Sequence, residues 1–497
     1  MLHNPDELRG RGPAARAGER RGRDGAYWPP VSGPPSRATE RVAIVVAAMA
    51  AFITPFTGSA TNVALPAIGR ELALDAVTLS WISTIYLLSA AVFLVPFGKL
   101  ADIRGRKRVF VAGLFVHGAT SALCAVAPSG PFLLAGRAAQ GLGGGMIFGT
   151  SVAVLTSVFP SGRRGEAIGV HVAAVYLGLS LGPPLGGVLT QQLGWRAVFV
   201  VNAVLGLLAA GIGARGLVGD WAEAAGERLD VRGALLYGVG LAALMYGLGR
   251  LPGAEGTALV AGGLGALAAF VAWERRVAHP LLEMTLFSEN RVFAFSNLAA
   301  LINYAATFAV GFLLSLYLQS IGGHSAQAAG ALLAAQPLVQ AVVSPFAGRL
   351  SDRVDSRAVA SSGMALIALG LALLALPATL PLHYVVGCLV LLGAGFGLFS
   401  SPNTNAVMAS VEQRRYGVAS ATLATMRLVG QMLSMGLATL LLALFMGHEP
   451  VGPASHAAFV AAARTAFGLF AGLCVAGTFA SLARGRTATA TAAGPGG

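Results

Sequence analysis

Long apolar stretches recur along almost the whole chain, and they constrain its fold more than any other feature. A helix needs about 20 mostly apolar residues to cross a bilayer. Fourteen stretches meet this requirement or nearly do so, and short loops separate them: 42–68, 77–100, 109–127, 131–158, 166–189, 197–214, 233–248, 257–273, 292–319, 326–348, 358–376, 382–408, 417–446 and 457–482. The stretch 233–248 is the shortest, and the flanking Arg232 and Arg250 would extend it by reaching the headgroups. The sequence therefore predicts an all-α membrane protein.

The composition excludes several other classes of protein. Only 11% of the 497 residues are charged and 55% are hydrophobic, whereas soluble domains carry about 25% charged residues. The three cysteines, Cys124, Cys388 and Cys474, lie inside apolar stretches, so they offer neither a disulfide framework nor a metal site. The net charge of +13 is scattered over many loops, which argues against a nucleic-acid partner.

The loop charges predict the orientation of the chain in the membrane, because positive residues stay on the cytoplasmic side. The N-terminal tail and one set of alternate loops carry nearly all the arginines that lie outside the apolar stretches, with the loop clusters at 104–108, 163–164, 228–232, 275–276, 349–357, 414–415 and 484–486. The other set has little more than Arg70, Arg196 and Arg250. We therefore expect a multi-pass protein of the inner membrane with both termini in the cytoplasm.

The two ends of the chain are polar. Residues 1–41 and 485–497 are predicted to be disordered cytoplasmic tails, with attraction of the first to anionic lipid as the alternative. Neither end has the apolar stretch of a signal peptide.

An internal repeat at an offset of 250 residues divides the rest of the chain. The segment Gly98-Lys-Leu-Ala-Asp102 is matched by Gly348-Arg-Leu-Ser-Asp352, and Arg163-Arg164-Gly165 by Arg414-Arg415-Tyr416-Gly417. Repeated halves are common in transporters. We expect six-helix halves at 42–218 and 291–484, with two inserted helices and their loops at 219–290.

Three motifs carry a resemblance to a known family. They are the loop 98–108, with Gly98, Leu100, Asp102, Gly105, Arg106 and Lys107 in place and Ile103 departing from the pattern; Arg137-Ala-Ala-Gln-Gly141; and the glycine- and proline-rich 178–187. Over residues 42–482 the chain resembles the fourteen-helix drug:proton antiporter branch of the major facilitator superfamily. The resemblance implies multidrug or antibiotic efflux by alternating access, driven by protons.

The first motif predicts a conformational latch. Asp102 lies beside Arg106, so it can form a charge-assisted contact or cap a neighbouring helix, and Asp352 with Arg357 repeats the arrangement. The predicted latch comprises Gly98, Asp102, Gly105, Arg106, Asp352 and Arg357. The alternative is a set of solvated charges that only fix topology.

The third motif predicts close helix packing. Gly178, Gly182, Gly186 and Gly187 form a smooth stripe, and Pro183 adds a kink. The stripe fits either a hinge between the halves or a static contact.

The acidic residues are missing from the predicted membrane interior, whereas two arginines, Arg137 and Arg427, enter it. An arginine there is a functional candidate by default, with satisfaction by backbone carbonyls as the alternative. Thr57 stands where the family usually has aspartate, and threonine cannot cycle a proton. His171 is the predicted substitute on the proton path, His117 is weaker, and a packed neutral histidine is the alternative for either.

Polar and aromatic residues inside the apolar stretches are candidates for a substrate cavity, although hydrogen bonds between helices would explain each one equally well. They are Thr57, Asn62, Trp81, Tyr86, Asn303, Tyr304, Gln336, Asn403 and Gln431. A cavity that holds arginine and no acid favours neutral or anionic compounds.

No enzyme motif, cofactor site or metal-ligand spacing occurs in the sequence, and there is no phosphate-binding loop for ATP. We predict an exporter of small amphipathic molecules with protons as the coupling ion. The alternatives are an uncoupled facilitator or metabolite importer, and a membrane sensor that binds ligand without transporting it.

Overall fold

The computed structural model describes residues 37–351, 353–377, 379–412, 415–447 and 449–485, and within these ranges the chain is helical, with no strand. Its α-helices are α1 (Arg37–Glu71), α2 (Ala76–Arg104), α3 (Arg106–Ala125), α4 (Gly130–Val158), α5 (Arg164–Leu193), α6 (Arg196–Gly216), α7 (Val231–Leu248), α8 (Ala254–Glu274), α9 (Met284–Glu289), α10 (Arg291–Leu316), α11 (Ala326–Leu333), α12 (Ala335–Ser351), α13 (Ser356–Ala375), α14 (Leu382–Ala409), α15 (Tyr416–Met446) and α16 (His456–Ala483). Fourteen segments are long and apolar enough to cross a membrane, which confirms the predicted all-α membrane fold.

The first helix begins earlier than the sequence predicted. Helix α1 starts at Arg37, so the last residues of the expected tail 1–41 form its first turn, where Glu40 faces the positive end of the helix dipole. The rest of both expected tails, 1–36 and 486–497, lies outside the described residues.

The shortest predicted span is a complete helix. Asp230 caps the start of α7 by accepting a hydrogen bond from the backbone N–H of Gly233 at 3.0 Å. This cap satisfies a backbone donor that helices leave unpaired at their N-terminus.

The tenth predicted span is two helices rather than one. Helix α11 ends at Leu333 and α12 begins at Ala335. Pro337 explains the break, because proline has no N–H to donate to the carbonyl of Leu333 and its ring collides with that carbonyl. Helix α10, before it, continues through a π-helical turn at Tyr317–Ile321.

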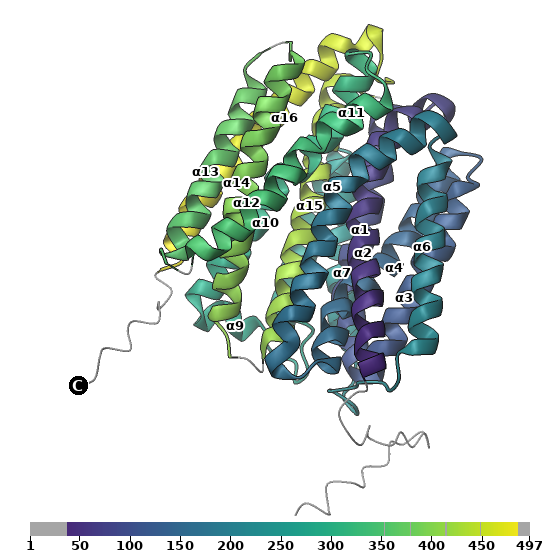
Figure 1. Ribbon diagram of the computed structural model, residues 1–497. Helices are drawn as coiled ribbons and strands as arrows, with labels where there is room; N and C mark the ends of the chain where they lie inside the picture. The colour runs from purple at the N-terminus through teal and green to yellow at the C-terminus, as the bar shows by residue number, and fades with distance from the viewer. Residues whose placement is uncertain (1–36, 352, 378, 413–414, 448, 486–497) are drawn as a thin grey trace, which may run out of the picture.

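The predicted repeat appears as two equivalent bundles that stand side by side (Figure 1). In the N half, α1 packs on α5 and α6, α2 on α4, and α3 on α4 and α6; in the C half, α10 packs on α15 and α16, α12 on α14, and α13 on α14 and α16. We call the end of the molecule where α1 begins and α16 ends the proximal end, and the opposite end the distal end.

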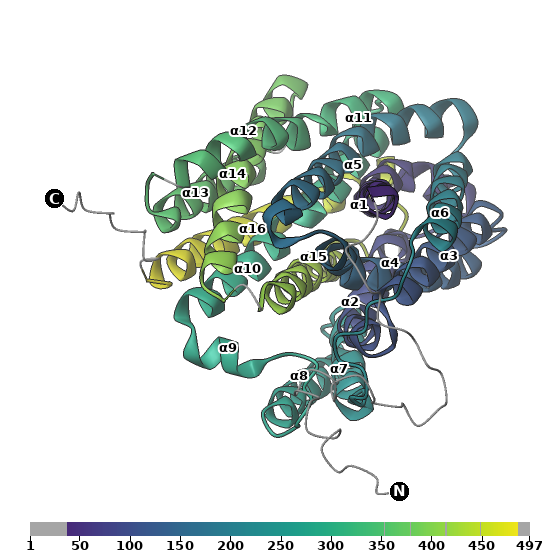
Figure 2. The ribbon, with the colours of Figure 1, turned by 60° about the horizontal axis from the view of Figure 1, so that its bottom comes forward.

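The two inserted helices lie outside this pair of bundles. Helix α7 packs against α2 and α15, one from each half, and α8 packs against α7 (Figure 2). The sequence did not predict the short helix α9, which follows α8 and leads into α10 at the proximal end.

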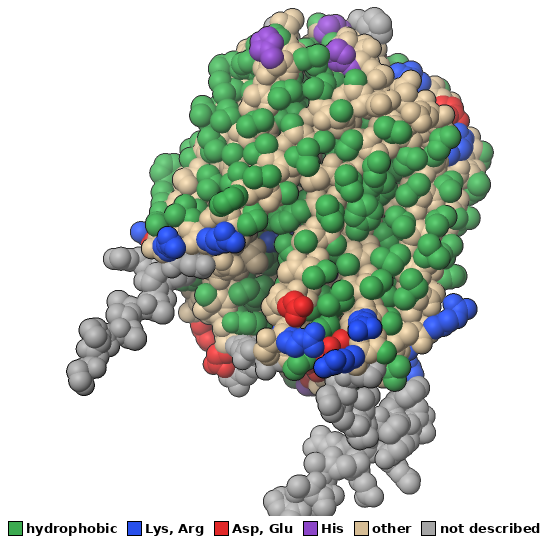
Figure 3. Space-filling view, viewed as in Figure 1, with side chains coloured by type: hydrophobic (Ala, Val, Ile, Leu, Met, Phe, Trp, Pro, Cys, Tyr) green, Lys and Arg blue, Asp and Glu red, His purple; other side chains and the backbone are tan. Residues whose placement is uncertain are grey.

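The surface matches a bilayer environment. Apolar side chains such as Leu177, Leu181, Val342 and Phe346 are exposed along the middle of α5 and α12. Charged side chains gather toward the ends of the molecule (Figure 3). A soluble protein would not expose so wide an apolar belt.

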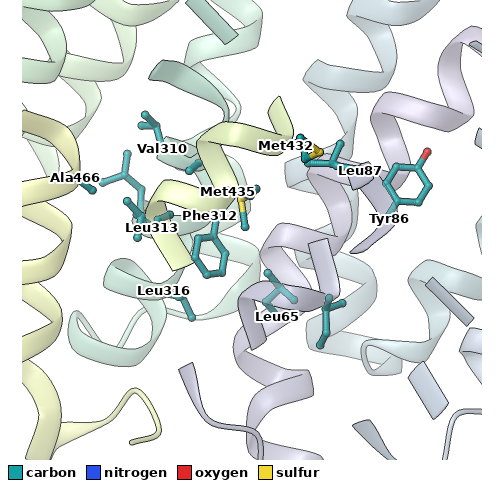
Figure 4. Packing of buried hydrophobic residues seen from close by; sticks show 14 of the residues in the cluster. Leu65, Tyr86, Leu87, Val310, Phe312, Leu313, Leu316, Met432, Met435 and Ala466 are labelled. Atoms are coloured by element: carbon teal, nitrogen blue, oxygen red, sulfur yellow. The ribbon is translucent and has the colours of Figure 1, made fainter. Parts of the chain in front are cut away.

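Buried apolar side chains also join the two halves. Leu65 and Leu87 from the N half belong to the same packed cluster as Phe312, Met432 and Met435 from the C half (Figure 4). The contact between the halves is thus apolar and closely packed in this region.

Candidate functional site

The proximal loop between α2 and α3 forms a network of ion pairs. Arg106 donates from Nε to Asp102 at 2.7 Å and makes a bidentate contact with Glu223, at 2.6 and 2.7 Å. Its Nη1 also donates to Ser157 at the end of α4. Such bidentate pairs are among the stronger side-chain contacts, and Arg106 itself is buried.

The acidic partners come from the segment 217–230, which connects α6 to α7. Asp220 accepts from the backbone N–H of Lys107 at 3.1 Å and pairs with Arg108 at 3.1 Å. Gly105 has a positive φ of 115°, and a Cβ on it would collide with the Asp220 carboxylate. Glycine is therefore required here by both the backbone conformation and the close approach of the acid.

Lys99 extends the same network. It donates to Glu227 at 2.6 Å, and His279 lies 3.3 Å from the same carboxylate oxygen. The hydrogen bond from Lys99 is the main cause that lowers the pKa of Glu227, and His279 adds to the effect. Gly98 contacts the backbone of Gly149. The contacts found for the predicted latch residues of the N half thus lie within that half and the segment that follows it.

The corresponding loop of the C half is different. Asp352 lies outside the described residues. The guanidinium of Arg357 lies 3.6 Å from the carboxylate of Asp355, and Asp355 caps α13. Arg357 also donates a hydrogen bond at 3.4 Å to the carbonyl of Leu482 at the end of α16. Here the arginine ties α13 to α16 inside one half.

The glycines of the α5 stripe pack against two different helices, α1 and α11. Gly178, Gly182 and Gly186 face α1, where a Cβ would meet Phe52 O, Ser59 Oγ and Ala60 Cα, respectively. These three glycines let two helices of the same half approach closely.

Gly187 instead faces the other half. A Cβ on it would collide with the carbonyl of Ala326 in α11, and a Cβ on Gly330 of α11 would collide with the carbonyl of Pro183. The pair forms a tight contact between α5 and α11 near the distal end.

Further hydrogen bonds join the halves at the distal end. Ser315 donates to the carbonyl of Asn62 at 2.8 Å, Gln319 donates to the carbonyl of Val63 at 2.9 Å, and Ser80 pairs with Thr439 at 2.8 Å. We call this set, together with Gly187 and Gly330, the distal seam. Near the middle of the molecule the described residues add a longer contact, from Ser344 to Tyr176 at 3.3 Å.

Arg137 lies in the interior of the N half and is 1% exposed. It donates to the carbonyl of Ile82 at 3.0 Å and to Gln140, whose amide donates to Ser121 at 2.6 Å. The guanidinium carbon also lies 4.4 Å from the centre of the Tyr86 ring. A backbone carbonyl, an amide and an aromatic face therefore compensate the buried charge in place of a carboxylate.

Thr57 points into the same interior. It donates to Asn202 of α6, and its Oγ1 lies 3.3 Å from Nε2 of His117 in α3. The His117 ring meets Tyr86 edge to face at 6.3 Å, and its Nδ1 has no hydrogen-bond partner among the described residues. The structure thus brings together His117, Thr57, Tyr86 and the Arg137 motif. The sequence favoured His171 over His117 as the group on the proton path, because the spacing of residues along the chain does not show that α3 packs beside α1 and α6.

His171 lies apart from this network. It is half-buried on α5, with Nδ1 3.3 Å from Ser151 of α4. Ser151 is fourteen residues beyond Arg137 on α4, which is about 21 Å along a helix. The predicted proton-path residues therefore fall into separate places.

Arg427 of α15 is only partly buried. Its Nη2 donates to Thr404 of α14 at 2.7 Å, its guanidinium carbon lies 5.8 Å from the centre of the Tyr304 ring, and Nε has no hydrogen-bond partner among the described residues. Tyr304 also lies within electrostatic range of Tyr176, which belongs to the N half. This arginine therefore retains donors and lies near the boundary between the halves.

The remaining predicted cavity residues do not form one cluster. Asn62 accepts from Ser83 at 2.9 Å, Trp81 meets Tyr246 of α7 edge to face, and Asn403 is buried against Arg484. Asn303 is fully buried with both amide atoms unpaired. Gln336 and Gln431 are half-buried, and Gln431 follows Arg427 by one turn.

Comparisons with known proteins decide the family. A model of the Major Facilitator Superfamily matches residues 47–232 and 297–495. The chain belongs to the Major Facilitator Superfamily. The interruption in the match contains α8 and α9, most of the expected insertion.

Several relatives of this superfamily member are named as exporters or resistance proteins. The cephamycin export protein CmcT of Amycolatopsis lactamdurans is 36% identical and covers 84% of this chain and 88% of its own length. The puromycin resistance protein pur8 of Streptomyces alboniger is 32% identical, and the match covers 79% of this chain and 80% of pur8. The riboflavin transporter RibZ of Clostridioides difficile (strain 630) is 28% identical, and the match covers 78% of this chain and 84% of RibZ. The resemblance to efflux-type members is thus confirmed.

A solved structure supports the fold. The bacterial homologue of the human lysosomal transporter Spinster, in an inward-facing and unoccupied conformation, superposes with a TM-score of 0.66 at 17% identity. The match covers 90% of this chain and 98% of that chain.

Proposed function

We propose that this transporter exports small amphipathic molecules, neutral or anionic, by alternating access and proton antiport. The observation that carries the substrate class is Arg427, a partly buried arginine near the boundary between the halves, whose buried Nε has no hydrogen-bond partner among the described residues. The named exporters among its relatives support the direction of transport.

The distribution of contacts between the halves supports alternating access. The short hydrogen bonds between them lie in the distal seam, whereas the proximal ion pairs of the described residues do not join the N half directly to the C half. Such a molecule is closed at the distal end, and alternating access requires the distal seam to open during transport.

The charge of the interior supports the substrate class. Among the described residues, the acids in the spanning helices lie in first or last turns: Glu40, Glu71, Asp102, Glu166, Glu255 and Glu274. A lipophilic cation would find aromatic rings but no carboxylate, whereas an anion would find Arg427.

His171 is the proposed proton carrier. It keeps partial exposure and one weak partner, Ser151. His117, by contrast, is fully buried next to Thr57 and close to the Arg137 motif. A group that exchanges protons in each cycle needs a route to water, which favours His171.

The proposed orientation places the proximal end in the cytoplasm of the inner membrane. The arginine-rich loops at that end support it. With this orientation both termini are cytoplasmic, and the structure is closed toward the outside.

The second candidate function is uncoupled facilitation or uptake. Thr57 in the position of the family's aspartate favours it, and the riboflavin transporter RibZ shows that relatives of this chain are not all named as drug exporters. A sensor without transport is the third reading. We infer no catalytic role.

The test is transport in proteoliposomes that contain a pH-sensitive dye, with matched anionic, neutral and cationic amphipaths. Antiport predicts proton movement driven by anionic or neutral substrate, lost in His171→Ala and kept in His279→Ala, a control on the proximal surface. Substrate flux without proton movement would instead support the facilitator. Binding of substrate without flux would support the sensor.

A further inference from the structure

The proximal ends of the two inserted helices hold a pair of acids, of which Glu274 is buried and Asp230 is half-buried. Asp230 caps the start of α7, and Glu274 is the last residue of α8. Glu274 is 3% exposed, which is unusual for an acid with no arginine or lysine partner among the described residues.

The two carboxyl groups face each other across Gly233. A Cβ on that glycine would collide with Asp230 Oδ2 and would lie 2.6 Å from Glu274 Oε1. The two oxygens therefore lie within about 5 Å of each other, a range in which two like charges oppose each other's ionisation. A side chain larger than hydrogen at position 233 would separate the pair.

Three of the four oxygens of the pair, including the facing Asp230 Oδ2, have donors. Asp230 accepts from the backbone of Gly233 at 3.0 Å and from Trp273 Nε1 at 2.8 Å, and Glu274 Oε2 accepts from the backbone of Leu282 at 2.9 Å. Glu274 Oε1 is buried and has no donor among the described residues. A buried carboxylate oxygen without a donor is costly, and a proton on it would turn it into a donor toward Asp230.

The charged side chains on the neighbouring segments are exposed or contact groups other than the two acids. Arg232 of α7 lies over the Trp273 ring at 5.7 Å, Arg275 and Arg276 after α8 are exposed, and His279 contacts Glu227. None of them is within ion-pair distance of Asp230 or Glu274 in the described part of the chain. The pair thus lacks a cation to hold both groups ionised.

We propose that Asp230 and Glu274 form a proton-binding site that shares one proton and fixes the proximal end of the α7–α8 hairpin. The bound proton forms an O–H bond on one carboxyl group, which donates a hydrogen bond to the other. Release of the proton to water leaves two neighbouring carboxylates, that of Glu274 buried, and their repulsion separates the start of α7 from the end of α8.

The site has a route to the rest of the molecule. Tyr237 of α7 donates to the carbonyl of Ala91 in α2 at 3.2 Å, and Met245 packs against Gly436 of α15. The hairpin therefore touches a helix from each half, so proton release at its proximal end acts on the boundary between them. The site is distinct from the proposed proton carrier His171, and its detection requires no transport.

The test is infrared difference spectroscopy of the purified full chain in lipid nanodiscs, titrated over roughly pH 5 to 9. The wild type is expected to lose the C=O band of a protonated carboxylic acid within this range, above the pH at which exposed acids titrate. The band is expected to be absent from Glu274→Gln and present in Glu255→Gln, which changes the exposed acid at the other end of α8. A band that persists in Glu274→Gln, or a wild type without the band at the acidic end of the range, would overturn the proposal.

A stability measurement excludes misfolding as the cause of a missing band. The amide of Glu274→Gln donates to Asp230 at every pH, so this variant should melt at the wild-type temperature in the acidic range. Because the folded wild type holds a proton that the unfolded chain has released, its melting temperature should fall below that of the variant as pH rises. Equal melting temperatures at all pH values would contradict the proposal.

Discussion

Each half carries an arginine well inside a spanning helix, Arg137 in α4 and Arg427 in α15, but the surroundings of these two arginines differ. Arg137 is almost completely buried and is held by a carbonyl, an amide and an aromatic ring. Arg427 has an unpaired, buried Nε among the described residues and lies near Tyr304, which in turn lies near Tyr176 of the N half. The comparison supports our proposal that the repeat has separated two roles, with the N-half arginine stabilising its bundle and the C-half arginine binding substrate.

The α2–α3 loop of the N half and the α12–α13 loop of the C half also differ in their contacts. The N-half loop binds three acids of the following segment, Asp220, Glu223 and Glu227. The described residues of the C-half loop have the Arg357–Asp355 pair and a carbonyl at the end of α16. The N half is therefore the more firmly cross-linked of the two at this end.

The largest effect is expected for Arg137→Ala. The variant leaves Oε1 of Gln140 without its donor and opens a cavity beside Tyr86, which should cost about 2 to 5 kcal/mol of stability. Thermal unfolding in detergent measures this cost. An Arg137→Ala protein that melts like the wild type would contradict the structural role assigned to this residue.

The next largest effect is expected for Arg427→Ala, which should act on transport more than on stability. A lost hydrogen bond to a charged group is worth about 1.5 to 3 kcal/mol, so the KM for anionic substrates should rise by roughly 10- to 100-fold. Initial transport rates measure the change, and the melting temperature serves as the control. A large fall in melting temperature with an unchanged KM would exchange the roles of the two arginines.

A smaller effect is expected at the distal seam. Gly187→Leu should push α5 away from Ala326 of α11, whereas Gly178→Leu should strain only the contact with α1, each at about 1 to 3 kcal/mol. Ser315→Cys, introduced as a reporter in the seam, should react faster with an impermeant maleimide in Gly187→Leu and at the original rate in Gly178→Leu. Equal labelling in both variants would show that the seam does not depend on Gly187.

The smallest effect is expected for Glu227→Gln at the proximal loop. The pKa of Glu227 is lowered mainly by the hydrogen bond from Lys99, so its contribution is complete above the ordinary carboxyl pKa of about 4.3 and disappears as pH falls through the lowered value. The pair is partly exposed, and the loss at neutral pH should be only about 0.5 kcal/mol. Melting curves of variant and wild type should converge in acid. A constant difference at all pH values would mean that the contact is not electrostatic.

Much of the fold could be predicted from the sequence, because the length of an apolar stretch and the charge of its loops follow directly from the bilayer. The fourteen spans and the two repeated halves were accessible in this way. The break between α11 and α12 at Ala334 was missed, although Pro337 is its visible cause. The start of α1 inside the expected tail was missed because polar residues can begin a helix outside the apolar stretch.

The candidate site was less predictable, since it depends on which helices lie next to each other. The sequence identified Arg137, Arg427 and the substitution at Thr57, but it could not show that His117 meets Thr57 or that Arg427 keeps a free donor. The acids of 217–230 were part of a charged loop in the sequence, and only the fold shows them as partners of the proximal loop. Pairings between distant segments require the packing of the helices.

The most direct test of the central claim compares an anionic amphipath with its neutral methyl ester in proteoliposomes that carry wild type or Arg427→Gln. The account predicts that the variant loses transport of the anion by roughly 10-fold or more and keeps transport of the ester. Equal loss of both compounds, or unchanged transport of the anion, would contradict the claim that Arg427 receives the substrate.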